Sequence, residues 1–268
     1  MRILKRRKKR RRLGLALGSG GAKGLAHVEF LRVIDQLKIR PSIISGSSMG
    51  ALIGALYASG ISAKEIENIY THMTFGPLSR LVDLSFNNKG IIKGKSIIKL
   101  LKNTLPVHTF EELKIPLLLV ATDFWRQEQV VLDKGSLIDA IRASISIPGI
   151  FEPIKIEDRI LIDGGIINPV PYDIIRDRCD YLIAIDVISK SAKVSQKMPN
   201  MFECILGSFS MMHRSIEEHK ESHYGPDLHI KIDMGEIGIL DFHKLKSILP
   251  LIRKEIYKFR DILEQKDF

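Results

Sequence analysis

The first sixty residues contain two short apolar segments, and each is followed by a glycine-containing turn and a helical pattern. The apolar segments are Leu13–Leu17 and Ser42–Ser45, and the helical patterns are Leu25–Leu37 and Met49–Ser59. A strand, a helix and a second strand in this order are typical of parallel strands joined by crossover helices. Four later segments are also expected to be strands, namely Leu117–Ala121, Ile160–Ile162, Leu182–Val187 and Leu228–Ile232. The pattern therefore predicts an α/β fold built on a parallel sheet.

Positive charge is concentrated in residues 2–12, RILKRRKKRRR. This stretch carries nine of the net ten positive charges, so the rest of the chain is close to neutral. Such a run is typical of a solvated, disordered tail, and it can also attract anionic lipid head groups or nucleic acid. The run contains no aromatic residue, and no nucleic-acid-binding motif occurs elsewhere, so lipid is favoured and no nucleic-acid partner is expected. We therefore separate a basic arm, 1–12, from a single domain, 13–268.

Cysteine content and hydropathy indicate in which cellular compartment the protein is expected and whether it crosses a membrane. Cys179 and Cys204 are too few for a disulfide framework and fit a reducing compartment. The basic start followed by LGLALGSGGAKG imitates a signal peptide, but its apolar part is short and broken by glycine. Residues Pro41–Ala63 lack charge, yet their glycines and serines favour a buried turn and helix over a membrane span. We expect a cytoplasmic protein that is soluble, or peripheral at a membrane through its arm.

The segment Gly46–Gly50, GSSMG, matches G-x-S-x-G with Ser48 at its centre. Glycines on both sides permit a sharp strand-to-helix turn that exposes the central hydroxyl, and the following helix N-terminus favours a developing anion. Glycine and serine are also common in ordinary turns. From its residues alone the segment is either a nucleophile elbow or a plain turn.

The earlier loop Gly18–Gly24, GSGGAKG, has three possible interpretations. It does not match the dinucleotide-binding pattern G-x-G-x-x-G, and it is not a Walker A loop because Lys23 is followed by Gly24. The third possibility is an oxyanion hole made by backbone N–H groups at a helix N-terminus. This is favoured because the loop and the Ser48 turn would lie at the ends of neighbouring parallel strands.

A serine nucleophile needs a base, and the eight histidines offer none in a recognisable catalytic context. The apolar segment Ile160–Ile162 ends in Asp163, Gly164 and Gly165. The tripeptide D-G-G is most often a plain turn. An aspartate within reach of Ser48 could nevertheless act as the base if burial raised its pKa. No cluster has the spacing of a metal site, so no metal or cofactor is expected.

The three segments together resemble the patatin-like phospholipases. That family combines a glycine-rich oxyanion loop ending in Lys or Arg plus Gly, a G-x-S-x-G elbow and a D-G-G or D-G-A aspartate. Its members use a Ser–Asp dyad without histidine. Here the three occur in the family's order, and Arg142–Pro148, RASISIP, resembles the segment that precedes the aspartate. The resemblance covers residues 13–187, and Ser19 departs from it because many members carry glycine there.

The resemblance implies a three-layer fold with a central, mostly parallel sheet flanked by helices. It divides the domain into core motifs, 13–187, and a C-terminal extension, 188–268. Ser48 would attack a lipid acyl ester, Asp163 would accept its proton, and backbone N–H groups of Gly20, Gly21 and Ala22 would hold the oxyanion. The remaining motif residues would shape the site; they are Gly18, Ser19, Lys23, Gly24, Gly46, Gly50, Gly164 and Gly165.

Alternative functions remain open at this level. An acyltransferase would use the same acyl-enzyme, and an idle lipid- or partner-binding protein could keep the fold. The substrate could be a phospholipid, a lysophospholipid or a simpler carboxylic ester. Residues 76–94 read as a mobile insert, and residues 189–226 have no clear pattern. Apolar positions over Phe242–Gln265 predict a helix that packs on the domain, or else one that lies on a membrane.

Overall fold

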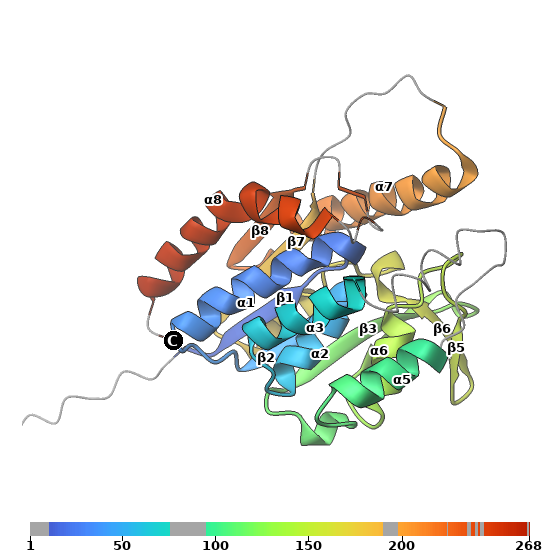
Figure 1. Cartoon of the computed structure of the whole chain (residues 1–268), viewed down its shortest axis with the longest axis horizontal. Coiled ribbons are helices and arrows are strands. Elements are labelled where there is room, and N and C mark those ends of the chain that lie inside the picture. Colours follow the sequence, from blue (N-terminus) through green and yellow to red (C-terminus); the bar gives the residue numbers. More distant parts are fainter. Residues whose placement is uncertain are drawn as a thin grey trace, which may run out of the picture.

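The structure, a computed structural model, is built on one eight-stranded sheet. It describes residues 11–75, 95–189, 198–223, 225–234, 237–238, 241, 244–266 and 268. The strand order is β5-β6-β3-β2-β1-β7-β8, and β4 pairs with β3 off this path (Figure 1). The strands are β1 (Leu13–Leu17), β2 (Ile43–Ser47), β3 (Leu117–Asp123), β4 (Glu128–Leu132), β5 (Ile154–Ile156), β6 (Arg159–Asp163), β7 (Tyr181–Ser189) and β8 (Leu228–Asp233). The centre from β3 to β8 is parallel, as expected, while β4, β5 and β6 pair in antiparallel fashion.

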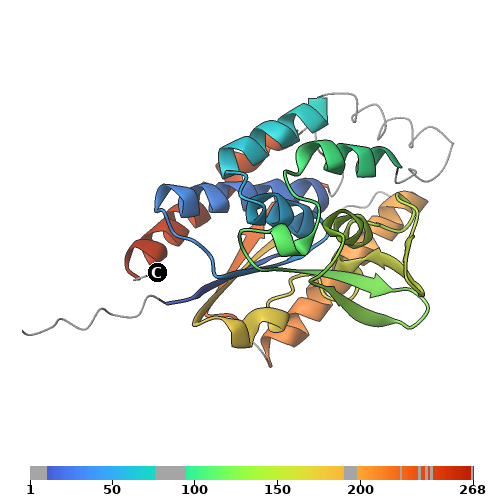
Figure 2. The same ribbon diagram turned by 90° about the horizontal axis from the view of Figure 1, so that it is seen from below.

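Helices cover both faces of this sheet, which confirms the expected three-layer α/β arrangement. The α-helices are α1 (Ala26–Gln36), α2 (Met49–Ala58), α3 (Ala63–Phe75), α5 (Lys95–Thr104), α6 (Leu137–Ser144), α7 (Met201–Glu221) and α8 (Leu245–Glu264). Short 3-10 helices are η1 (Gly21–Leu25), η2 (Phe110–Glu112), η3 (Gly164–Ile166) and η4 (Asp173–Arg178). In Figure 2, α7 lies on the side of the sheet away from α3 and α5.

The two faces carry different cores because side chains alternate along each strand. In β1, Leu13, Leu15 and Leu17 join the larger apolar cluster, which includes residues of α1, α2, α3, α5, α6 and α8. On the opposite face Ala16 belongs to a smaller cluster with residues of β7 and η4. The small side chain at this position leaves room for η4 and its neighbours to approach the sheet.

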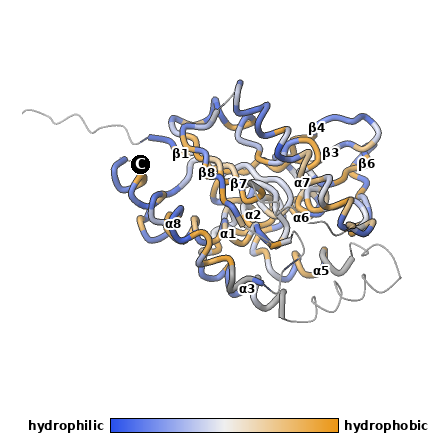
Figure 3. The backbone as a smooth tube through the Cα atoms, turned by 90° about the horizontal axis from the view of Figure 1, so that it is seen from above, coloured by the Kyte–Doolittle hydropathy of each residue, from blue (hydrophilic) through white to orange (hydrophobic). Residues whose placement is uncertain are grey.

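The C-terminal helix packs on the domain, as the first of its two interpretations predicted. Phe259 of α8 meets Phe30 of α1 edge to face, with ring centroids 5.2 Å apart. Four residues of α8 spaced along one face are buried: Ile248, Ile252, Phe259 and Leu263. Figure 3 shows hydrophobic and hydrophilic residues alternating along this helix.

One edge of β3 brings two strand ends together. Along this edge β2 pairs in parallel up to Ser47, which lies opposite Val120. The next position, Ala121, pairs in antiparallel fashion with Asp163 at the end of β6. The strands β2 and β6 therefore run toward each other and stop at adjacent positions, so the turn at Ser48 and the carboxyl group of Asp163 must be neighbours.

Several elements differ from the sequence-based expectations. Strands β4 and β5 and helix α7 were not predicted, because β4 and β5 are short strands without fully buried residues and α7 mixes apolar and charged residues. The expected insert at 76–94 and residues 1–10 of the expected arm lie outside the described residues. Arg12, placed in the arm from sequence, pairs with Asp180 at 2.9 Å.

Close backbone packing at Gly50 gives a test of this arrangement. A Cβ atom there would lie 2.1 Å from the carbonyl oxygen of Leu17 and 2.6 Å from that of Gly18. We expect Gly50→Ala to lower the free energy of unfolding by about 3 kcal/mol or more, since neither backbone can retreat without disturbing the sheet. Chemical denaturation would measure the change.

The matched control is Gly207→Ala on α7, where a Cβ atom would meet nothing within 4 Å. That variant should be as stable as the natural protein or up to about 1 kcal/mol more stable, because alanine favours helix. Equal effects of the two substitutions would contradict the packing described here.

Candidate active site

Ser48 occupies a sharp turn between β2 and α2. Its φ of 53° and ψ of −120° are unusual for a residue with a side chain. Its backbone N–H donates to the Ser144 hydroxyl at 2.9 Å, which ties the turn to the end of α6. Because α2 begins at the next residue, the positive end of that helix lies beside the Ser48 side chain. The geometry is that of an elbow rather than of an ordinary turn.

Asp163 faces this hydroxyl across the junction of the two strands. Ser48 Oγ donates to Asp163 Oδ2 at 2.6 Å, and the other carboxylate oxygen accepts the N–H of Gly165 at 2.7 Å. Burial raises the pKa of Asp163 to about 7, although the bonds from Ser48 and Gly165 and the charge of His213 oppose the shift. The carboxyl group can therefore exchange a proton near neutral pH.

Close packing explains the glycine that follows this aspartate. A Cβ atom on Gly164 would lie 2.1 Å from the Val120 carbonyl oxygen and 2.9 Å from the Ser47 hydroxyl. Any side chain at this position would therefore push the aspartate away from the Ser48 turn.

The loop between β1 and α1 borders the same site. It turns into η1 at Gly21, so the N–H groups of Gly20, Gly21 and Ala22 belong to the first turn of a helix and have no preceding carbonyl to bond. The buried His27 holds the loop from behind, since its Nε2 donates to the Gly18 carbonyl at 2.8 Å. Burial lowers the pKa of His27 to about 4, so this histidine is neutral at physiological pH.

The segment Arg142–Pro148 forms another wall. The buried Arg142 donates hydrogen bonds to the Ser146 hydroxyl and to the Glu152 carbonyl. The carbonyl of Ser146 in turn accepts the N–H of Asp163 at 3.0 Å. Arg142 thus stabilises the backbone that fixes Asp163, while Ile147 and Pro148 face the pocket.

A pocket connects these parts, and its wall is mostly apolar. Ser48 and Asp163 both line it. The other lining residues are Ser19, Gly20, Gly21, Ile147, Pro148, Gly165, Ile166, Ile188, Leu206, Phe209 and His213. Of the expected oxyanion residues, Ala22 is buried and does not line the pocket. The motif residues Gly18, Lys23, Gly24, Gly46, Gly50 and Gly164 are not among the lining residues.

Sequence reasoning missed the wall that α7 supplies. Leu206, Phe209 and His213 come from the segment that had no clear pattern. A recognisable signal was present, since His213, Glu217 and Glu221 recur every four residues and mark a polar face of one helix.

The family can be assigned once this geometry is known. The family model described as patatin-like phospholipase matches residues 15–176, more than half of the chain, and this range contains the loop, the elbow and Asp163. The chain belongs to the patatin-like phospholipase family. The resemblance stated from the sequence is thereby confirmed.

Relatives of this patatin-like domain include much longer proteins. An uncharacterised NTE family protein of Mycobacterium tuberculosis is 38% identical over 160 residues, which are 60% of this chain and 44% of the relative. The neuropathy target esterase sws of Drosophila melanogaster is 31% identical over 185 residues, 66% of this chain and 13% of that protein. The chain thus spans less than half the length of these relatives. Among solved structures, VipD from Legionella pneumophila has a TM-score of 0.49 and 14% identity over 96% of this chain and 72% of that one.

Neither a metal-binding cluster nor a membrane-spanning helix is found in the residues that the structure describes. Among them no group of three or more His, Cys, Asp or Glu side chains is arranged to hold a metal ion. Within the same part of the chain, no helix combines the length and the apolar character needed to cross a membrane.

The raised pKa of Asp163 predicts how stability depends on pH. The folded protein releases this proton near pH 7, whereas an unfolded aspartate releases it near about pH 3.9. Between these values the folded state binds more protons, so the Asp163 contribution to the free energy of unfolding falls as pH rises from about 4 to about 7. The Asp163→Asn variant cannot titrate and should gain stability relative to the natural protein over this window.

Urea denaturation of both proteins between pH 4 and pH 8 measures the difference. A difference that stays constant across the window would contradict the raised pKa.

Proposed function

We propose that this domain is a serine-dependent lipid acyl hydrolase that works through a Ser48–Asp163 dyad. The observation that carries the proposal is the 2.6 Å hydrogen bond from Ser48 Oγ to Asp163 Oδ2 inside an apolar pocket. The family supports the reaction class, and relatives named as an esterase and as phospholipase domain proteins support an ester substrate.

In this proposal Ser48 Oγ attacks the ester carbonyl while its proton passes to Asp163. A carboxyl group with a pKa of about 7 is ionised above neutral pH and is basic enough to share that proton. The carbonyl oxygen becomes negative, and N–H groups at Gly20 and Gly21 stabilise it; each such donor contributes about 3 kcal/mol. Asp163 then returns the proton to the departing alcohol, which leaves an acyl-enzyme on Ser48.

Water completes the cycle by the reverse sequence. Asp163 takes a proton from the water molecule as it attacks the acyl carbonyl, and Ser48 regains its proton as the fatty acid departs. An acyltransferase would use another alcohol in place of water. The released product distinguishes the two, because only hydrolysis yields the free acid.

The apolar lining supports an acyl chain as the group that enters the pocket. Ile147, Ile166, Ile188, Leu206 and Phe209 contribute apolar surface around the dyad. Burial of a hydrocarbon chain against such surface is favourable by about 0.8 kcal/mol per methylene group.

A fluorophosphonate probe tests the nucleophile, because it reacts with activated serines. The natural protein should be labelled, and Ser48→Ala should not be labelled. Asp163→Asn should react about 10²- to 10⁴-fold more slowly, because the general base is lost. The rate of labelling and the hydrolysis of a lysophospholipid would be measured together.

Ser47→Ala is the matched control. Ser47 is the adjacent buried serine, and its hydroxyl finds no hydrogen-bond partner among the described residues. This variant should be labelled at the natural rate. Labelling that survives Ser48→Ala would show that another group is the nucleophile.

We further propose that the basic arm attracts the domain to anionic lipid surfaces. Residues 2–10 carry seven positive charges, and each contributes up to about 1 kcal/mol near an anionic membrane. Deletion of residues 2–10 leaves the Arg12–Asp180 ion pair intact. The shortened protein should bind phosphatidylglycerol vesicles more weakly and with less dependence on salt.

Vesicle sedimentation at about 50 mM and about 300 mM salt would measure both effects, because the screening length differs between these two salt concentrations. A full-length variant with the seven basic residues replaced by serine and glutamine separates charge from length. Binding that stays unchanged in this variant would overturn the role of the arm.

A further inference from the structure

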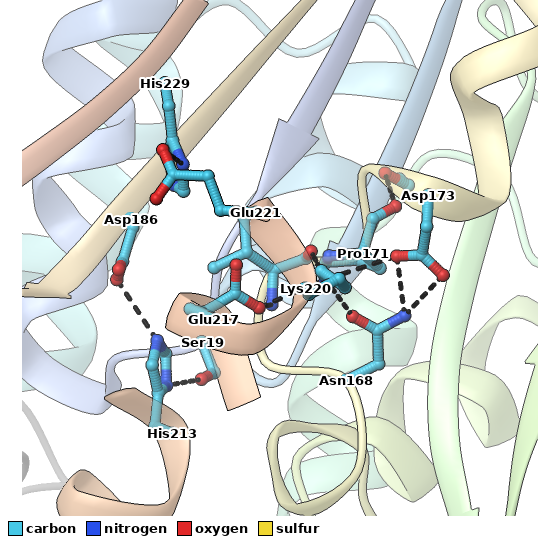
Figure 4. Close-up of polar contacts among 12 residues, drawn as sticks. Ser19, Asn168, Pro171, Asp173, Asp186, His213, Glu217, Lys220, Glu221 and His229 are labelled. Carbon is cyan, nitrogen blue, oxygen red and sulfur yellow. Dashed lines mark hydrogen bonds and ion pairs between the residues drawn. The ribbon is translucent and has the colours of Figure 1, made fainter. Parts of the chain in front are cut away.

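A chain of three buried polar side chains joins α7 to the glycine-rich loop. His213 Nδ1 lies 3.2 Å from the Ser19 hydroxyl, and His213 Nε2 lies 3.2 Å from Asp186 Oδ1 (Figure 4). The three residues come from the β1–α1 loop, from α7 and from β7, and all three are buried. Ser19 and His213 also line the pocket that holds Ser48 and Asp163.

The chemistry of Asp186 assigns the direction of these hydrogen bonds. Hydrogen bonds from His213 and from the Ile188 N–H lower the pKa of this carboxyl despite its burial, so it is ionised and can only accept. It accepts the Ile188 N–H at 2.8 Å and therefore a proton on Nε2 of His213. In a neutral imidazole this leaves Nδ1 as the acceptor for the Ser19 hydroxyl.

Ser19 is held on three sides. Its N–H donates to the Pro169 carbonyl at 2.8 Å, and its hydroxyl meets His213 at 3.2 Å. A Cβ atom placed on Gly165 would lie 2.9 Å from Ser19 Oγ, so this hydroxyl also packs against the backbone that bonds Asp163. The next residues in the chain are Gly20 and Gly21, which line the pocket and whose N–H groups would hold the oxyanion in the proposed function.

The rest of α7 is anchored independently of this link. Glu217 Oε1 accepts the Val170 N–H at 3.2 Å, and Lys220 Nζ donates to Asn168 Oδ1 at 2.7 Å. Lys220 also lies over the Tyr172 ring at 4.0 Å from its centroid. Removal of the Ser19 hydroxyl would thus cut the link between His213 and the loop while these other contacts of α7 remain.

We propose that His213, aligned by Asp186, is a positioning residue that fixes the glycine-rich loop through the Ser19 hydroxyl and so orients the N–H groups of Gly20 and Gly21. Asp186 and His213 both lie beyond residues 15–176, the range that the family model matches. The inference rests on the proposed function, in which those N–H groups hold the oxyanion.

Two amide substitutions separate the two contacts of the imidazole. In His213→Asn the amide reaches the position of Nδ1 and can still accept the Ser19 hydroxyl. In His213→Gln the longer side chain reaches the position of Nε2 and can still donate to Asp186. The third variant, Ser19→Ala, removes only the hydroxyl.

We expect Ser19→Ala and His213→Gln each to lower kcat about tenfold or more with KM within about twofold, because the loss of a whole oxyanion donor costs about 10²- to 10³-fold. His213→Asn should retain most of the activity. The double variant Ser19→Ala/His213→Gln should be no slower than the worse single variant, since both break the same link.

His229→Gln is the control for the loss of a buried histidine. His229 on β8 forms a hydrogen bond with Glu221 of α7, and it does not line the pocket. This variant should keep the natural kcat even if the protein becomes less stable. A merely structural role of His213 would make His213→Asn and His213→Gln alike in kcat.

Hydrogen exchange gives a readout that does not depend on catalysis. Peptides that cover residues 18–25 should exchange faster in Ser19→Ala and His213→Gln than in the natural protein or in His229→Gln. Unchanged exchange and unchanged kcat in Ser19→Ala would overturn the inference. Faster exchange in a protein whose natural form hydrolyses no ester would uphold the positioning role and refute the proposed function instead.

Discussion

The backbone of β3 holds Ser48 and Asp163 next to each other. Its one edge pairs first with β2 and then with β6, and the change of partner falls between Val120 and Ala121. Ser48 follows the last paired residue of β2, and Asp163 is the last residue of β6, so main-chain hydrogen bonds bring the two side chains together. The elbow, the glycines beside it and the walls around it all depend on this junction. A change in the register of either strand would separate Ser48 from Asp163.

Around this junction the protein buries groups that would prefer water. Asp163 and the guanidinium of Arg142 are both buried, and burial shifts each pKa toward the neutral form of its group. The cost of burial is offset by hydrogen bonds from fixed neighbours, such as Gly165 for Asp163 and Ser146 for Arg142. The proposed base is basic because it is buried, and its carboxylate is held in place by the hydrogen bonds from Ser48 and Gly165.

The sequence was informative where local patterns decide the structure. Glycines around Ser48, the apolar strand before it and the small-residue helix after it predicted a strand-to-helix turn, either a nucleophile elbow or a plain turn, and the order of the motifs predicted the family. The sequence could not show that β6 runs antiparallel to β3, because strand direction depends on pairing between distant residues. The role of His213 also depends on residues that are distant along the chain. Its role rests on contacts with Ser19 and Asp186, 194 and 27 residues away along the chain.

The pocket is lined by two stretches of the chain, one inside the range that the family model matches and one beyond it. The proposed nucleophile, the proposed base and the glycine-rich loop lie within residues 15–176, whereas Ile188, Leu206, Phe209 and His213 lie beyond them. In the proposed function, the first stretch thus supplies the reactive groups and part of the apolar wall, and the second stretch supplies the rest of that wall. A protein with the same first stretch and a different second one would keep Ser48 and Asp163 but would have a different apolar wall beside them. In the proposed function that wall would fit a different acyl group. Sequence divergence in the second stretch would therefore change which acyl group fits the pocket before it changed the proposed reaction.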